Sequence, residues 1–231
     1  MSAQGVSVLP TGAKRIGMMI LITVLLVLIV FSARAGVSYV VQYRTHAALD
    51  HWQKSPDKRP TLNAWQGMLD SVKEMLAFDA KNADLQNALA RLYFYRAGNM
   101  DSSAKQSLQD YKQAIAGYRT VIALRPSWPY GYLNLLYNKV FVGELDAEMR
   151  DSLLHLIQLS PWEKNTLSDT VKVAVFVWPG LDKQSQQAVK SYLLLTSEKR
   201  KGEVVRALKE SQLKDRFCQQ IARGQAMSVC R

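Results

Sequence analysis

The sequence has few of the residues from which metal centres and enzyme active sites are commonly built. It contains two cysteines and three histidines in 231 residues. Their positions, Cys218, Cys230, His46, His51 and His155, match no zinc-binding spacing. The chain also lacks a Gly-x-Ser-x-Gly sequence, a glycine-rich phosphate loop and a zinc-protease signature. We therefore expect no metal, no cofactor and no catalytic residue, and the sequence favours a protein that is not an enzyme.

Acidic residues are scarce as well. Nineteen Asp and Glu stand against thirty Lys and Arg, which gives a formal net charge of +11. The basic residues are densest over 199–216, and four acidic residues, Glu198, Glu203, Glu210 and Asp215, are interleaved with them. Such a mixture is typical of a solvated helix face, and a patch that meets anionic lipid or an acidic partner is the alternative. No basic arm is present, so we expect no nucleic-acid partner.

Three carboxylates, Glu144, Asp146 and Glu148, lie close together in the sequence. Paired carboxylates can serve acid–base catalysis. These three, however, coincide with the expected start of a helix, where Asp146 would cap the first turn. The helix-capping interpretation is favoured over the catalytic one.

A long apolar run covers residues 16–33 and contains no charged residue. At about 1.5 Å per residue its 18 residues span about 27 Å, just enough for the bilayer core. Lys14 and Arg15 precede it, which favours a cytoplasmic N-terminus and a periplasmic remainder in a bacterial inner membrane. A cleaved signal peptide is the alternative, because Ala33-Arg34-Ala35 has the form of a cleavage site. The length of the run favours an uncleaved anchor.

Apolar residues recur at helical spacing over most of the remaining chain and predict an all-α protein. The predicted helices cover 62–78, 84–97, 107–124, 128–142, 146–159, 163–177, 183–195 and 202–216. Residues 171–177 are β-branched, but they lie between helical patterns without a strand partner, so a helix is favoured there. The polar segment 54–61 contains two prolines and predicts a hinge.

These patterns divide the chain into five parts. They are a cytoplasmic tail (1–15), a transmembrane helix (16–33), a helical stalk with a hinge (34–61), a helical repeat domain (62–216) and a C-terminal tail (217–231).

The predicted helices form a repeat. Leu124-Arg125-Pro126 and Leu159-Ser160-Pro161 lie 35 residues apart, close to the 34-residue period of tetratricopeptide (TPR) repeats, and residues 78–83 form a similar corner with Ala80 in place of proline. One helix pair cannot bury its apolar face alone, so neighbouring pairs must stack. We expect a short TPR-like α-solenoid of antiparallel helix pairs with a C-terminal capping helix, and we expect Tyr118 in its core.

The corner sequences carry a closer resemblance. Pro126-Ser127-Trp128-Pro129-Tyr130, the later Ser160-Pro161-Trp162-Glu163 and the N-terminal apolar helix resemble VpsP-type polysaccharide biosynthesis proteins. These are membrane-anchored TPR proteins of bacterial exopolysaccharide systems, and the resemblance covers residues 13–215. It implies an accessory role in polysaccharide assembly or export, with envelope proteins as partners.

Aromatic residues gather around two of the corners. First helices of such repeats line a concave groove, and we expect Tyr95, Trp128, Tyr130, Asn134 and Asn138 to face it. The groove would hold a partner's peptide segment, which makes the protein a scaffold. Alternatives are a carbohydrate-binding module that stacks on the aromatic rings, and an assembly factor for pili or secretion. Packing between repeats would also explain the aromatic residues.

The two cysteines lie near the C-terminus. In an oxidising compartment Cys218 and Cys230 would form a disulfide that closes a short loop. Two unpaired thiols, one of them buried, remain the alternative.

Overall fold

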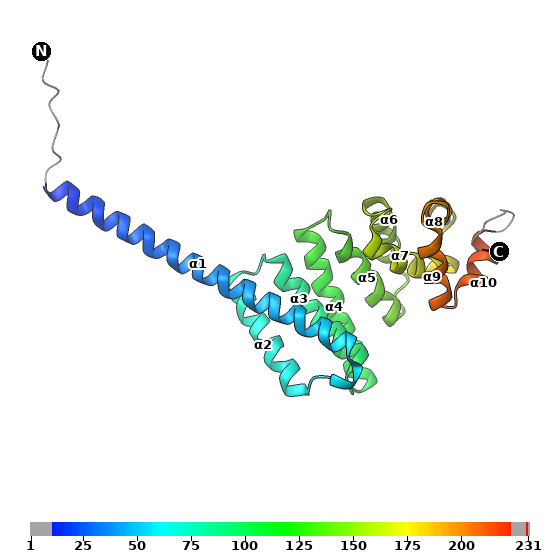
Figure 1. Cartoon of the computed structure of the whole chain (residues 1–231), viewed down its shortest axis with the longest axis horizontal. Helices are drawn as coiled ribbons and strands as arrows, with labels where there is room; N and C mark the ends of the chain where they lie inside the picture. The colour runs from blue at the N-terminus through cyan, green and yellow to red at the C-terminus, as the bar shows by residue number, and fades with distance from the viewer. Residues whose placement is uncertain (1–10, 223–229, 231) are drawn as a thin grey trace, which may run out of the picture.

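The computed structural model describes residues 11–222 and Cys230. Over residues 11–222 it contains ten α-helices and no strand, so the predicted all-α class is confirmed (Figure 1). The helices are α1 (Thr11–Lys54), α2 (Leu62–Phe78), α3 (Ala83–Asn99), α4 (Ala104–Leu124), α5 (Pro129–Val142), α6 (Ala147–Leu159), α7 (Lys164–Val177), α8 (Lys183–Lys199), α9 (Lys201–Glu210) and α10 (Lys214–Arg216). The β-branched residues 171–177 belong to α7, as predicted.

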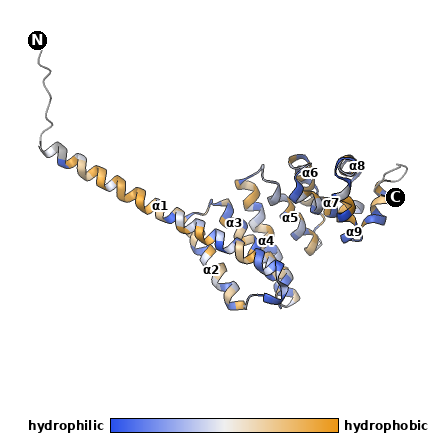
Figure 2. Ribbon diagram, in the orientation of Figure 1, coloured by the Kyte–Doolittle hydropathy of each residue, from blue (hydrophilic) through white to orange (hydrophobic). Residues whose placement is uncertain are grey.

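Helix α1 carries the apolar run in its first half, which extends away from the other helices and is the most continuously hydrophobic part of the chain (Figures 1 and 2). This segment is long and apolar enough to cross a membrane, and none of its apolar window is buried by the rest of the protein. An apolar surface of this length needs an apolar surrounding, and a bilayer provides one.

The second half of α1 differs from the predicted stalk. The helix continues without a break to Lys54, but it packs along α2 and α3 instead of standing alone. Leu49 is fully buried there with Trp65 of α2 and Leu92 of α3. The Trp65 indole Nε1 donates a hydrogen bond to the Leu92 carbonyl at 2.9 Å. Residues up to Lys54 are therefore part of the helical domain.

Local sequence sets the ends of the helices. Side-chain oxygens accept hydrogen bonds from first-turn N–H groups at six N-caps, Thr61, Asn82, Ser103, Asp146, Glu163 and Asp182. Proline stands at the start of α5, where no N–H is required. Gly143 ends the same helix with a φ of 76°, a left-handed conformation that glycine adopts without strain.

Most helices pack on the helix that follows in the sequence, and several also pack on the helix after that one. Helix α3 packs on α4, α4 on α5 and α5 on α6, while α1 contacts α3, α5 contacts α7 and α7 contacts α9. The α3–α4 pair approaches closely at Ala90 and Gly117, where a Cβ on the glycine would lie 2.8 Å from the Ala90 Cβ. Beside this crossing, Tyr118 is buried with Ala114 and Leu135, as predicted.

The C-terminal end departs from the prediction of one capping helix over 202–216. Helix α9 stops at Glu210, because Gln212 adopts a left-handed φ of 58° before the short α10 begins. Phe217 and Ile221, in the segment predicted as a tail, are buried in the largest core cluster. Of the two interpretations of the cysteines, the disulfide is present, with Cys218 and Cys230 bonded and their Cα atoms 5.7 Å apart.

Replacing Tyr118 should destabilise the domain. Tyr118→Ala removes a side chain that is only 1% exposed, and comparable truncations of large aromatic residues cost about 3–5 kcal/mol. Thermal unfolding of the full chain in detergent should show a clearly lower melting temperature. Tyr118→Phe, which keeps the ring, should melt close to the wild type. An unchanged melting temperature for Tyr118→Ala would contradict this core placement.

Candidate functional site

An open groove of about 700 Å³ runs along one side of the helical domain. Helices α1, α3 and α5 each contribute residues three or four positions apart, which lie on one helix face. The lining residues are His46, Asp50 and Gln53 from α1, Asp84, Asn87, Arg91 and Phe94 from α3, and Tyr130, Asn134, Tyr137 and Phe141 from α5, together with Tyr118, Trp128 and Asp169. Stripes of side chains from three helices therefore form one surface.

Three of the five residues predicted to face the groove lie in its lining. They are Trp128, Tyr130 and Asn134. The rings of Trp128 and Tyr130 lie 5.4 Å apart and are half-buried, so part of each ring is accessible to a ligand.

The prediction was wrong for Tyr95 and Asn138. Tyr95 is 1% exposed and packs against Trp52 in the core between α1, α2 and α3. Asn138 is also 1% exposed, and its Nδ2 donates to the Asn134 carbonyl at 2.8 Å. The reason is geometric, because each residue turns an α-helix by about 100°. Tyr95 follows Phe94 and Asn138 follows Tyr137, so each is rotated away from the groove stripe.

An arginine on α3 organises the groove wall that α1 and α3 form together. Arg91 Nη1 lies 2.6 Å from His46 Nδ1, and Arg91 Nη2 donates to Asp50 Oδ1 at 2.6 Å. Burial, followed by the charge of Arg91, lowers the pKa of His46 below its usual 6.5. The imidazole is therefore neutral at pH 7, and its Nδ1 can accept the arginine's hydrogen bond.

The other lining carboxylates also have cationic neighbours. Both oxygens of Asp84 accept hydrogen bonds from Arg125, each at 2.6 Å, which ties the start of α3 to the corner before α5. Asp169 lies 3.5 Å from the Lys172 ammonium. Although the chain has a net charge of +11, the charges in this groove are largely neutralised in pairs.

The side-chain oxygen of Asn87 is a hydrogen-bond acceptor that no donor of the described chain reaches. Its side chain is 6% exposed, and within the described part of the chain no hydrogen bond reaches its Oδ1 atom. Buried polar atoms are usually hydrogen-bonded, because an unpaired one costs free energy. Since Asn87 lies in the groove lining, a donor group on a bound ligand could satisfy this oxygen.

Aromatic rings stand at both ends of the groove, and polar side chains occupy its middle. Trp128 and Tyr130 lie at the start of α5, whereas Phe94 and Phe141 form a pair near the helix ends, with ring centroids 5.9 Å apart. Tyr137 also lines the groove, and its pKa is raised, first by burial and then by the negative charge of the Asp169 carboxylate. The arrangement offers aromatic faces and hydrogen-bond acceptors, which suits binding of an extended ligand.

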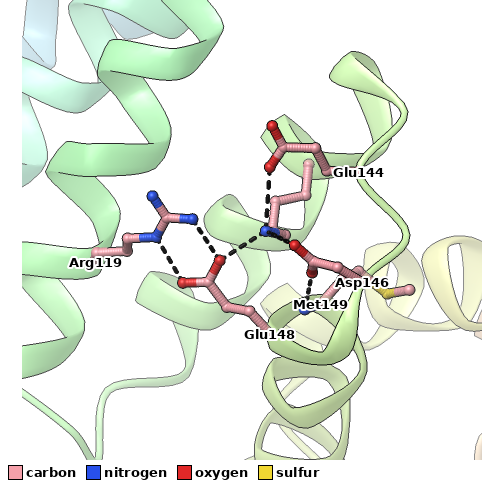
Figure 3. A network of polar contacts seen from close by, with 6 residues as sticks. Arg119, Glu144, Asp146, Glu148 and Met149 are labelled. Atoms are coloured by element: carbon pink, nitrogen blue, oxygen red, sulfur yellow. Dashed lines mark hydrogen bonds and ion pairs between the residues drawn. The ribbon is translucent and has the colours of Figure 1, made fainter.

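The carboxylates at the α5–α6 turn form a separate network (Figure 3). The fully buried Lys139 donates from Nζ to Glu144, Asp146 and Glu148 at 3.2, 2.8 and 2.6 Å. Arg119 of α4 binds both oxygens of Glu148, each at 2.6 Å. Asp146 also accepts from the Met149 N–H at 2.9 Å, which confirms its predicted capping role.

Sequence reasoning missed most of the α3 and α1 walls. Asp84, Asn87, Arg91 and Phe94 follow the spacing of one helix face, which was a detectable signal. The α1 residues were assigned to a stalk, so their contribution to a groove was not expected. Within the described residues, no cluster of His, Cys, Asp and Glu could hold a metal ion.

Comparison with known protein families and with curated proteins produced no match to this chain.

Acidification should test the network at the α5–α6 turn. Hydrogen bonds from Arg119, then those from Lys139, lower the pKa of Glu148 from 4.5 to about 2. A carboxylate with a lowered folded-state pKa stabilises the fold above its unfolded-state pKa, and this contribution is lost as the pH falls from about 4.5 to about 2. The melting temperature of Glu148→Gln should therefore fall less than that of the wild type as the pH is lowered from about 4.5 to about 2.

The control is Glu74→Gln, which changes an exposed glutamate of α2 outside this network. It should keep the wild-type dependence of melting temperature on pH. If Glu148→Gln keeps it as well, Glu148 does not contribute to acid sensitivity as argued.

Proposed function

We propose that this chain is a membrane-anchored, TPR-like scaffold of the bacterial envelope, whose periplasmic groove holds a segment of a partner protein and thereby supports exopolysaccharide synthesis or export. The observation that carries the proposal is the groove itself. Three helices contribute aligned stripes of aromatic and amide side chains to one open surface.

The helix contacts support a solenoid arrangement. Most successive helices pack on each other, and contacts between every second helix join α1 to α3, α5 to α7 and α7 to α9. Such contacts between neighbouring units are the basis of stacked helical repeats. The second half of α1 and α2 would then form the first pair, and the odd-numbered helices would line the concave side.

Two features favour a periplasmic domain. Lys14 and Arg15 precede the apolar run, as expected for a cytoplasmic N-terminus. The disulfide between Cys218 and Cys230 is of a kind that persists in oxidising compartments such as the bacterial periplasm. Together they support the orientation in which the helical domain is outside the cytoplasm.

The dimensions of the groove suit a short extended segment. Tyr130 and Phe141 are eleven residues apart on α5, which is about 16 Å along the helix axis. This length corresponds to about five residues of extended chain. The rings at the two ends would take apolar side chains, while Asn87 and Asn134 in the middle would hydrogen-bond to the partner's backbone.

Direct binding of polysaccharide is a second candidate. Half-buried Trp128 and Tyr130 rings next to polar side chains suit stacking against sugar rings, and the unpaired Asn87 Oδ1 could accept from a hydroxyl. The paired charges of the groove are also compatible with an uncharged glycan.

Substitution of two lining residues tests the proposed groove. Tyr130→Ala with Asn134→Ala should reduce the recovery of cross-linked envelope proteins about tenfold or more, which corresponds to about 1.4 kcal/mol. Both side chains are partly exposed, so the fold should persist. The measurement is in-cell cross-linking through a C-terminal tag, followed by mass spectrometry of the captured material.

The matched control is Trp162→Ala with Asn165→Ala, an aromatic and an amide residue that are exposed outside the groove. This variant should capture partners as the wild type does. Wild-type protein capture by the groove variant would refute the groove as the surface that binds a partner protein. Loss of a co-purifying polysaccharide, with protein capture unchanged, would instead favour the carbohydrate candidate.

A further inference from the structure

The last turn of α2 lies beside the end of the apolar run. Ser38 of α1 is 8% exposed, and its hydroxyl lies 3.9 Å from the Met75 sulfur. The Arg34 guanidinium lies over the Phe78 ring, 5.2 Å from its centroid. Helix α2 therefore runs back along α1 until its C-terminal end reaches the first residue after the apolar run.

The contact between Arg34 and Phe78 sets the depth that Phe78 would have in a membrane. The apolar run is about 27 Å long, so all of it is needed to cross a bilayer core of about 30 Å. Arg34 follows the run directly and marks the boundary of the core. The headgroup layer extends about 5–7 Å beyond the core. Since Phe78 contacts Arg34, its ring falls within this layer.

The side chains at this corner have the chemistry of a membrane interface. Phe78 is 60% exposed, although it is aromatic, and no other part of the described chain covers it further. Lys81, in the turn that follows, is exposed and adds a second cation to Arg34, against one acidic residue, Asp79. Aromatic rings flanked by cations are favoured at headgroup level, where the ring is partly desolvated and the cations meet lipid phosphates.

We propose that the α2–α3 corner, residues 78–82 with Arg34, is a second membrane contact that sits among anionic lipid headgroups. The proposal rests on the membrane anchoring proposed above. Two attachment points would prevent the helical domain from swinging about the anchor. The groove would then be held at a set height, because His46 and Gln53 lie 12 and 19 residues beyond Arg34, about 18 and 28 Å along α1.

A fluorescence experiment tests this contact. The full chain, with its native disulfide intact so that only the new thiol reacts, is reconstituted into phosphatidylcholine–phosphatidylglycerol vesicles. Phe78→Cys carries a bimane label, and some lipids carry a spin label on the headgroup. We expect the headgroup spin label to quench the bimane at position 78 at least about threefold more than at a control position.

Phe176→Cys is the matched control, because this phenylalanine is also exposed and also has an arginine, Arg216, over its ring at 6.0 Å, but it lies on α7. Equal quenching at positions 78 and 176 would overturn the proposal. A third bimane label at Leu26→Cys lies within the apolar run, and its quenching by a spin label on the lipid acyl chains shows whether the run is inserted in the bilayer. Quenching at 26 without quenching at 78 refutes the corner contact alone, whereas no quenching at 26 refutes the anchor.

Discussion

The structure depends on the continuity of α1, which is a single helix from its apolar first half to the groove wall. The same helix that presents an exposed apolar surface over 16–33 also buries Leu49 among α2 and α3. The orientation of the groove relative to the apolar run is therefore set by one rigid element. Among the described side chains of α1, Ser38 is the first that is buried, so cleavage after Ala35 would remove the apolar run and Arg34 but would leave the packing face of α1 intact.

Ion pairs then connect neighbouring helices at specific points. Arg96 binds Asp110 across α3 and α4, Arg125 binds Asp84, and Arg119 binds Glu148. The two partly exposed pairs, Arg125–Asp84 and Arg119–Glu148, contribute little to stability, about 0–1 kcal/mol each, whereas Asp110 in the first pair is buried. Their geometry nevertheless selects one register between neighbouring helices, because a slipped helix would separate the charges. Apolar burial supplies most of the stability, and the ion pairs select the arrangement in which it is obtained.

The helices could be predicted because periodicity, caps and Pro or Gly breaks agreed along most of the chain. The face that each helix turns to the groove was harder to predict. Aromatic residues on α3 occur on more than one side, so Tyr95 could not be distinguished from Phe94 by pattern alone. The two prolines after Lys54 suggested a hinge and hid the role of α1 as a wall. The stop after Glu210 had no sequence signal, since glutamine rarely adopts the left-handed conformation of Gln212.

The groove lowers the stability of the free protein, because it contains a buried polar atom without a hydrogen bond, which an apolar core would not. An unpaired buried acceptor such as Asn87 Oδ1 costs about 1–3 kcal/mol in the free protein, and an apolar side chain of similar shape would not. The lining charges, in contrast, are held by Arg91, Arg125 and Lys172 before any ligand arrives. A ligand that brings a hydrogen-bond donor to Asn87 thus recovers free energy without having to reorganise those pairs. This combination of a preformed polar wall and one unsatisfied atom distinguishes a surface suited to binding from one that only separates helices.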